Sequence, residues 1–382
     1  MTKTPKLRFP GFTDAWEQDK VSKLMVRVSE ISDTTDIPTI EYEDVVSGSG
    51  SLIPGYERKE TNKKGIIFQN GDVLFGKLRP YLKNWLLAEF DGKAVGDWWV
   101  LHSEKLNSEF QYSLIQNSQF QEVANISTGT KMPRSDWKLV SEVKLFFPTL
   151  PEQEAIGTFF RQLDELLTLH QRKLDEVKNL KKSLLQKMFP KNGERIPEVR
   201  FPEFTAAWEQ RKLGEVVEIT MGQSPSSKNY TENPSDYILV QGNADMKNGH
   251  VVPRVWTTQI TKQAEKGDLI LSVRAPVGDI GKTDYDVVIG RGVAAIKGNS
   301  FIFQLLTKMK ITGYWTRFST GSTFESINSD NLKNAQIIIP SLKEQEKIGK
   351  TFNSINSLIS LHQRKLEHLQ SLKRALLQQM FI

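Results

Sequence analysis

The sequence predicts an α+β protein: two β-rich domains of mixed fold, separated by two long antiparallel coiled-coil spacer helices and related by pseudo-two-fold symmetry. Three observations lead to this prediction. Similar motifs occur twice at one constant spacing, the end of each half carries a long heptad pattern, and the middle of each half contains short turn-and-strand patterns.

The repeat keeps the same offset along the chain. The hexapeptide Leu-His-Gln-Arg-Lys-Leu occurs at residues 169–174 and again at 361–366, an offset of 361 − 169 = 192. The same offset relates residues 5–18 to residues 197–210, which share Arg-Phe-Pro-x-Phe-Thr-x-Ala-Trp-Glu-Gln. The chain is therefore two half-modules in tandem, and we expect them to share a frame.

Each half ends in a segment with the start signal and the periodicity of a long helix. A Ser/Thr-x-x-Glu capping box begins at Thr149 and again at Ser341. Apolar positions then recur at alternating spacings of four and three, which indicates a coiled-coil seam. The predicted seam residues are Ile156, Phe160, Leu163, Leu167, His170 and Leu174 in the first half, and Ile348, Phe352, Ile355, Ile359, His362 and Leu366 in the second.

Each helix is expected to run for about 35 residues, or about 50 Å. Two seams of equal length favour antiparallel packing of one helix on the other. The alternative is two separate helices, each lying on its own half. His170 and His362 interrupt the seams at the same heptad position. That position favours a structural polar pair that fixes the register over a general base or a metal ligand.

The middles of the two halves share little beyond a Gly-Asp-apolar-apolar motif. Turn-then-strand patterns are expected at residues 66–75 and 266–273, proline-terminated closing strands at 143–148 and 335–340, and shorter helices at 108–123 and 301–310. The chain then divides into a first β-rich domain, a first spacer helix, a second β-rich domain and a second spacer helix, at residues 1–150, 151–190, 191–342 and 343–382.

Composition limits the function. The chain has 382 residues, 38% of them hydrophobic and 25% charged, as expected for two globular domains. An excess of 51 Lys and Arg over 45 Asp and Glu favours an acidic partner such as DNA. The absence of cysteine excludes disulfides, thiolate metal sites and cysteine nucleophiles. No apolar run approaches the roughly 20 residues that span a bilayer, so we expect a cytoplasmic protein without membrane contact.

Three strings resemble catalytic motifs only in part. Gly-Lys-Thr at residues 281–283 lacks the first glycine of a phosphate loop. Asn-Pro-Ser-Asp-Tyr at 233–237 is one residue longer than the base-binding motif of adenine methyltransferases, and no Gly-x-Gly cofactor loop precedes it. Asp136, Glu142 and Lys144 imitate a metal-dependent nuclease at a spacing common by chance. We therefore expect no catalytic residue, no metal site and no cofactor bound by this chain.

Basic residues in loops are the better candidates for a binding site. In the first half, a basic loop follows a predicted strand at residues 76–85, and in the second half the loop at 272–276 takes the corresponding place. Loop arginines can donate to guanine or hold a phosphate; the alternative is a solvated turn. The candidate DNA-binding residues are Lys77, Arg79, Lys83, Thr130, Lys131, Arg134, Arg274, Arg291 and Thr323.

These motifs together resemble the specificity subunit of bacterial Type I restriction-modification systems. Each half opens with Arg-Phe-Pro-x-Phe-Thr-x-x-Trp-Glu and is closed by a Pro-x-Leu-x-Glu-Gln-Glu helix. In the second half, residues 222–225, 267–274 and 289–292 are similar to strings of target-recognition domains. The first half follows the family less closely, with residues 71–80 as its equivalent of 267–274. The resemblance covers essentially the whole chain.

The resemblance implies a sequence-specific DNA-binding subunit without catalytic activity of its own. Each target-recognition domain would bind half of a bipartite DNA target, and the helices would set the gap and dock two modification subunits. These methyltransferase subunits would use S-adenosylmethionine to methylate adenine, and motor-nuclease restriction subunits would use ATP and Mg²⁺. Two alternatives remain: a catalytic DNA methyltransferase or nuclease, or a coiled-coil interaction protein without DNA specificity.

Overall fold

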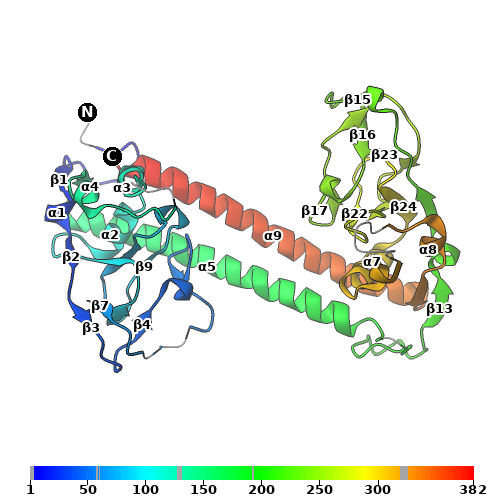
Figure 1. Cartoon of the computed structure of the whole chain (residues 1–382), viewed down its shortest axis with the longest axis horizontal. Helices are drawn as coiled ribbons and strands as arrows, with labels where there is room; N and C mark the ends of the chain where they lie inside the picture. Colours follow the sequence, from blue (N-terminus) through cyan, green and yellow to red (C-terminus); the bar gives the residue numbers. More distant parts are fainter. Residues whose placement is uncertain (1–3, 57–58, 60, 127–130, 192, 319–325) are drawn as a thin grey trace. The chain divides into compact units, whose positions relative to one another are not determined.

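The computed structural model of the chain describes residues 4–56, 59, 61–126, 131–191, 193–318 and 326–382. The chain forms two compact units: unit 1 comprises Met1–Leu174 with Leu361–Ile382, and unit 2 comprises Asp175–Ser360. The longest elements are α5 (Leu150–Lys187) and α9 (Leu342–Met380), and each contributes residues to both units (Figure 1). Long helices together with small sheets confirm the predicted α+β class.

Unit 1 contains two four-stranded sheets, with strand orders β2-β11-β8-β9 and β3-β7-β10-β4, and the two-stranded pairs β1-β12 and β5-β6. Its strands are β1 (Glu17–Lys20), β2 (Val26–Val28), β3 (Ile31–Ser32), β4 (Thr39–Ile40), β5 (Val45–Val46), β6 (Ser51–Leu52), β7 (Gly65–Phe68), β8 (Val73–Gly76), β9 (Trp85–Leu87), β10 (Gly92–Ala94), β11 (Trp98–His102) and β12 (Lys144–Phe147). Its shorter helices are α1 (Val21–Leu24), η1 (Tyr42–Asp44), η2 (Pro80–Leu82), α2 (Ser108–Leu114), α3 (Ser118–Ala124) and α4 (Trp137–Ser141).

Unit 2 contains a six-stranded sheet of order β14-β24-β21-β22-β18-β17, a five-stranded sheet of order β15-β19-β16-β23-β20 and the pair β13-β25. Its strands are β13 (Glu209–Lys212), β14 (Glu218–Met221), β15 (Tyr230–Thr231), β16 (Tyr237–Val240), β17 (Met246–Lys247), β18 (His250–Val251), β19 (Trp256–Thr257), β20 (Gln263–Ala264), β21 (Leu269–Ser272), β22 (Ile280–Lys282), β23 (Val287–Ile289), β24 (Val293–Lys297) and β25 (Gln336–Ile339). Its shorter helices are α6 (Leu213–Val216), η3 (Ser227–Asn229), η4 (Asn243–Asp245), α7 (Ser300–Ile311), η5 (Tyr314–Phe318) and α8 (Ser329–Lys333).

The central sheet has one strand order in both units, although the sequences differ. The order β2-β11-β8-β9 of unit 1 is repeated as β14-β24-β21-β22 in unit 2, which adds β18 and β17 at one edge. In the second sheet, β10 pairs in parallel with β4, and β23 pairs in parallel with β16. The divergent middles are therefore two versions of one topology.

Strands β8 and β21 are apolar on both faces because each separates two hydrophobic cores. In β8, Val73 and Phe75 belong to one cluster and Leu74 to another. In β21, Leu269 and Leu271 face one cluster and Ile270 the other. A strand with a core on each face carries a continuous apolar run, and this explains the Gly-Asp-apolar-apolar motif in both halves.

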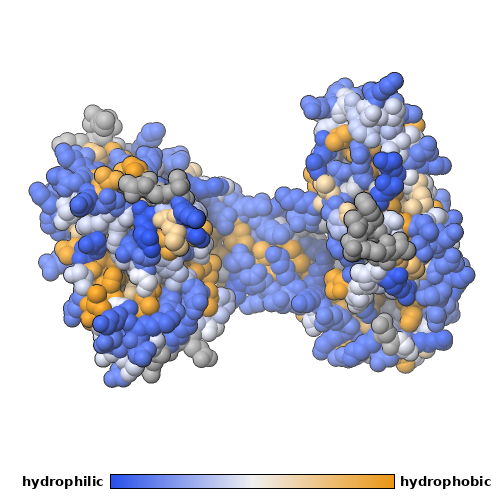
Figure 2. All heavy atoms as spheres, in the orientation of Figure 1, coloured by the Kyte–Doolittle hydropathy of each residue, from blue (hydrophilic) through white to orange (hydrophobic). Residues whose placement is uncertain are grey.

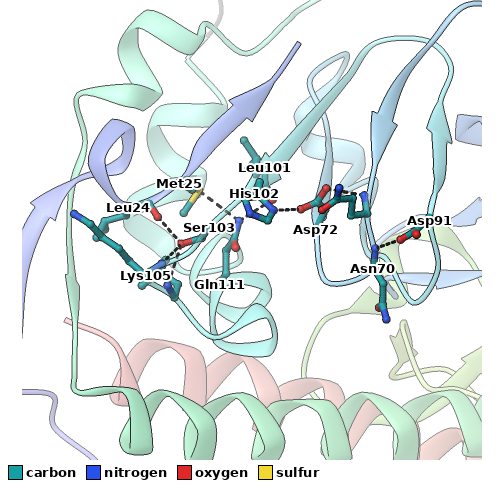
Figure 3. A network of polar contacts seen from close by, with 12 residues as sticks. Leu24, Met25, Asn70, Asp72, Asp91, Leu101, His102, Ser103, Lys105 and Gln111 are labelled. Carbon is teal, nitrogen blue, oxygen red and sulfur yellow. Dashed lines mark hydrogen bonds and ion pairs between the residues drawn. The ribbon is translucent and has the colours of Figure 1, made fainter. Parts of the chain in front are cut away.

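The aspartate of that motif closes the turn before the strand. Asp72 accepts a hydrogen bond from the backbone N–H of Gln69 at 2.8 Å, and Asp268 accepts one from Glu265 at 2.9 Å. In unit 1 the same carboxylate also lies 2.6 Å from Nδ1 of His102, a contact visible in Figure 3. The turn is thus shared by the units, and the histidine contact is an addition in unit 1.

In each half, an arginine of the opening Arg-Phe-Pro motif forms an ion pair with a glutamate in the first turn of the long helix. Arg8 donates from Nε and Nη2 to the carboxylate of Glu152 at 2.7 and 2.8 Å, and Arg200 does the same to Glu344. Both glutamates are buried. These are the glutamates of the predicted capping boxes, and the structure gives their carboxylates an arginine partner.

The end of each long helix completes the core of a unit. Phe381 packs against Trp16 and Phe110 in unit 1, with ring centroids 6.2 and 5.5 Å apart. Phe189 packs in the same way against Trp208 and Phe301 in unit 2, at 6.0 and 5.2 Å. The repeated tryptophan and Met-Phe motifs are therefore packing partners within each unit.

One expected helix is interrupted. The prediction of a single helix over residues 108–123 is wrong, because the chain forms α2 and α3 with a break between them. Asn117 causes the second start: its side chain accepts from the backbone N–H of Phe120 and caps α3. The closing strands β12 and β25, the strand β21 and the helix α7 lie where the sequence predicts them.

Within each unit, the segments of α5 and α9 run antiparallel. In unit 1, Asp164 accepts from Lys373, and further along α5 His170 contacts His362, so the α9 number falls as the α5 number rises. In unit 2, Phe189 of the α5 end contacts Phe352 near the α9 start. This is the direction of pairing that two equal seams favour.

Candidate nucleic-acid interface

Backbone hydrogen bonds establish which loop residues are equivalent in the two units. The N–H of Lys77, just after β8, donates to the carbonyl of Asp97 at 2.9 Å, and the N–H of Val273, just after β21, donates to Gly292 at 2.9 Å. The next bridge joins Leu78 to Arg134 and Arg274 to Ser326. The loops after β8 and β21 therefore occupy the same place, as the sequence predicts, but Arg274 corresponds to Leu78 and not to Arg79.

In unit 2 the two candidate arginines line one pocket. Arg274 follows β21, where the Ser272 hydroxyl donates to the Arg274 carbonyl at 2.8 Å. Arg291 lies in the turn before β24, and its N–H donates to the Ser224 hydroxyl at 3.1 Å. Both side chains are exposed. They border a pocket of about 510 Å³ lined by Ser224, Pro225, Ser227, Tyr230, Gln241, Gly242, Asn243, Ser272, Arg274, Ala275, Arg291 and Gly292.

The chemistry of this pocket suits a nucleic acid. None of its lining residues is acidic, so its two guanidinium groups give it a positive charge. Gln241 and Asn243 add amide groups that both donate and accept. Arginine with asparagine or glutamine is the residue set that donates to guanine and adenine edges, and the same arginines can hold phosphate.

In unit 1, two of the candidate basic residues form ion pairs with one carboxylate. Arg134 Nη2 lies 3.0 Å from Asp97 Oδ2, and Lys77 Nζ lies 3.5 Å from Asp97 Oδ1. Partial burial alone would raise the pKa of Asp97, but the hydrogen bond and charge of Arg134, together with Lys77, lower it below its ordinary value. The carboxylate is therefore ionised at neutral pH and offsets the charge of these two residues.

Two of the remaining candidates in unit 1 lie at the ends of η2. Arg79 and Lys83 are exposed, flank η2 and have left-handed backbones with φ of 50° and 57°. The Arg79 N–H donates to the Pro133 carbonyl at 2.7 Å, which brings it beside the Arg134 loop. The Lys83 carbonyl accepts from Gly48. Lys131 is exposed, and Thr130 and Thr323 lie outside the described residues.

Sequence reasoning missed Asp97 and the amide residues of the unit 2 pocket. Asp97 lies directly before β11, and the turn with Arg291 lies directly before β24, so the two turns are equivalent. The candidate Arg291 in the second half could therefore have pointed to the equivalent turn in the first half. Gln241 and Asn243 follow the buried end of β16 and have no distinguishing motif.

The predicted seam residues divide by position. Near the helix starts they are buried in the main core of a unit, as Ile156 and Phe160 are in unit 1 and Ile348 and Phe352 in unit 2. The other buried members are Leu163, Leu174, Ile355 and Leu366, whereas Leu167, His170, Ile359 and His362 are half-buried. A long helix therefore buries the start of its seam in the core of a unit, and its seam histidine contacts the other helix.

The two seam histidines meet in unit 1. His170 Nδ1 lies 3.1 Å from His362 Nδ1, and the ring centroids are 5.3 Å apart. Burial, followed by the positive charges of Lys365, His362 and Lys173, lowers the pKa of His170. A contact at this distance requires one Nδ1 to donate and the other to accept.

The two acidic residues of the nuclease-like string have structural roles. Asp136 caps α4 by accepting from the Lys138 N–H, and Glu142 pairs with Lys20 at 2.6 Å. Residues 281–283 include the end of β22. Within the part of the chain that the structure describes, histidine, aspartate and glutamate form no group of three that could hold a metal ion.

Hydrophilic residues cover most of the face visible in Figure 2, and hydrophobic residues form scattered patches between them. Among the described residues, no helix combines the length and apolar character needed to cross a membrane.

A duplicated chain whose two units share a frame and present different polar loops at the same place is a tandem recognition protein. The profile for the Type I restriction modification DNA specificity domain matches residues 21–179 and 206–371. The chain belongs to this family, and it carries two copies of the specificity domain. It is a DNA specificity subunit of the type I restriction class.

Similar proteins match this chain over different lengths. A Methanocaldococcus jannaschii protein, provisionally named the type I restriction enzyme MjaX specificity subunit, is 26% identical over 394 residues, covering 96% of this chain and 88% of the relative. The Escherichia coli type I restriction enzyme EcoDI specificity subunit is 32% identical over 127 residues, 32% of this chain and 28% of the relative. The crystal structure of a Type-I restriction-modification S subunit from M. genitalium shares the fold, with a TM-score of 0.67 at 15% identity and 99% of each chain covered.

Proposed function

We propose that unit 1 binds one half of a bipartite DNA target and unit 2 the other half. The observation that supports this is the pair of equivalent loops after β8 and β21, which display different side chains on one backbone. In this proposal residues 1–150 and 191–342 are target-recognition domains, and residues 151–190 and 343–382 are spacer helices. Two half-sites bound by one molecule gain affinity only when the linker lets both engage.

The chain itself contributes no catalytic group in this proposal. Two modification subunits dock on the helices and methylate adenine with S-adenosylmethionine, and restriction subunits add ATP- and Mg²⁺-dependent translocation and cleavage. The chain selects the site, and its partners act on it in the cytoplasm. The family membership and the structural roles of Asp136 and Glu142 support this division of labour.

The deciding experiment is methylome sequencing of cells that carry the chain with its modification subunit. We expect adenine methylation at one split motif with a fixed gap. Cells that carry the modification subunit alone provide the control and should lack that motif. An unchanged methylome in cells with both proteins would refute the proposal and return the interaction-protein alternative.

A further inference from the structure

Asp97 in unit 1 is equivalent to Gly292 in unit 2, a residue that lines the pocket of that unit. Its carbonyl accepts from Lys77 as that of Gly292 accepts from Val273, and Gly292 is one of the pocket residues. Asp97 is therefore the residue of unit 1 at the backbone position that Gly292 takes beside the pocket of unit 2. Unit 1 thus has an acidic side chain beside the basic residues Arg134 and Lys77, at a position where unit 2 has a glycine.

The difference is built into the two backbones. A Cβ on Gly292 would lie 2.0 Å from the Gln241 carbonyl oxygen, so unit 2 has no room for any side chain there. In unit 1 the backbone of Asp97 is held by Tyr42, whose hydroxyl donates to the Asp97 carbonyl at 2.5 Å and accepts from the Leu78 N–H at 3.2 Å. Asp97 is thus fixed in place before any ligand binds.

The group remains accessible. The side chains of Asp97 and Arg134 are 28% and 51% exposed, so neither is sealed in the protein. An ionised carboxylate only accepts hydrogen bonds, and it repels phosphate. Arg134 beside it only donates. A ligand that satisfies both must present an acceptor next to a donor, and a sugar-phosphate backbone offers no such donor.

We propose that Arg134 and Asp97 together recognise a G·C base pair in the half-site bound by unit 1, with Asp97 as the specificity-determining residue. In the major groove this pair presents the guanine N7 and O6 acceptors followed by the cytosine N4 amino donor. Arg134 donates to guanine and Asp97 accepts from cytosine. In the reversed pair Asp97 would face guanine O6, and in an A·T pair it would face thymine O4; both are acceptors that the carboxylate repels. The inference rests on the proposed DNA-binding function of unit 1.

The test is a binding selection from a randomised DNA library at fixed salt, using the full-length chain with its modification subunits. The wild-type chain should select a split motif with a G·C pair in the half-site of unit 1. Asp97→Asn, which is nearly the same size, should weaken the preference at that base pair about tenfold or more. The other positions and the half-site of unit 2 should not change.

Glu142→Gln is the matched control, because it removes one surface carboxylate that pairs with Lys20 outside this group. It should leave the preference at every position intact. A uniform rise in affinity of Asp97→Asn for all sequences, with the G·C preference retained, would overturn the inference and leave Asp97 as a charge clamp. A wild-type chain without any motif would overturn the proposed function itself, so the two failures are distinguishable.

Discussion

Unit 1 and unit 2 share the strand order of the central sheet and an arginine that pairs with a buried glutamate of the long helix, yet their loops differ in charge. In unit 2, Arg274 and Arg291 line a pocket without an acidic residue. In unit 1, Arg134 and Lys77 contact Asp97. The two units thus share a frame and differ in the charged side chains of equivalent loops.

The largest predicted effect concerns the arginine–glutamate pair that both units share. Arg8→Ala and Arg200→Ala should each destabilise their own unit by about 3 kcal/mol, because each leaves a buried glutamate charge without its arginine. Arg200→Ala should cost slightly less, since Trp208 Nε1 still donates to Glu344 at 3.3 Å. Hydrogen exchange resolved by unit is the measurement, because a chain with two cores does not unfold in one step.

Lys20→Ala is the control for those substitutions, because Lys20 forms an exposed pair with Glu142. It should change stability by less than about 1 kcal/mol. If Arg8→Ala destabilised unit 1 no more than Lys20→Ala, the arginine–glutamate pair would not be part of the common frame.

Arg274→Ala tests whether the pocket of unit 2 contributes to base recognition. Removing a bidentate guanine contact should reduce discrimination at one position of the half-site of unit 2 by about 2 kcal/mol, with no change in the half-site of unit 1. Lys266→Ala, in the turn at the other end of β21, is the matched loss of one positive charge. Equal weakening on all sequences would show that Arg274 holds phosphate.

A third test removes a lysine–aspartate pair from unit 1 and introduces the equivalent pair in unit 2. Lys373 of α9 pairs with Asp164 of α5 at 2.6 Å in unit 1, whereas the positions 192 residues away hold Lys181 and Asn356. Burial lowers the pKa of Lys181, so it gains from an acidic partner. We expect Asp164→Asn to destabilise unit 1 and Asn356→Asp to stabilise unit 2, each by about 1–2 kcal/mol.

Thermal unfolding followed by hydrogen exchange distinguishes these changes. Asn353→Asp is the control, because it adds the same charge to α9 at an exposed position whose side chain contacts Ser300. Destabilisation of unit 2 by Asn356→Asp would mean that the repeat does not bring position 356 to Lys181.

The smallest effect concerns the histidine pair. Because the pKa of His170 is lowered in the folded chain, the unfolded chain takes up the proton first as pH falls through about 6.5. Stability from this contact is therefore complete above that pH and is lost as the solution becomes more acidic. The melting temperature should fall less between about pH 7.5 and pH 5.5 in His170→Gln than in the wild type, and His368→Gln should behave as the wild type.

The sequence predicts well the features whose signals are local. The capping boxes at Thr149 and Ser341 predicted two helix starts, and α5 and α9 begin at Leu150 and Leu342. The break at Asn117 was missed because the apolar pattern continues through it. Asp97 was missed for a different reason: its role depends on Arg134 and Lys77, which only the folded sheet brings to it. Candidate arginines are visible in a sequence, whereas the groups that neutralise them are not.

The arginine–glutamate pairs have one further consequence. Each joins residues that are 144 apart in the chain, in unit 1 and in unit 2 alike. The recognition segment between them is thus a closed loop whose two ends are held at one fixed place on the helix. We therefore expect that a segment of another sequence, closed by the same pair, would leave those ends in place. Under the proposed function, we expect a change of this segment to alter the DNA target while both ends of the segment keep their place on the helix.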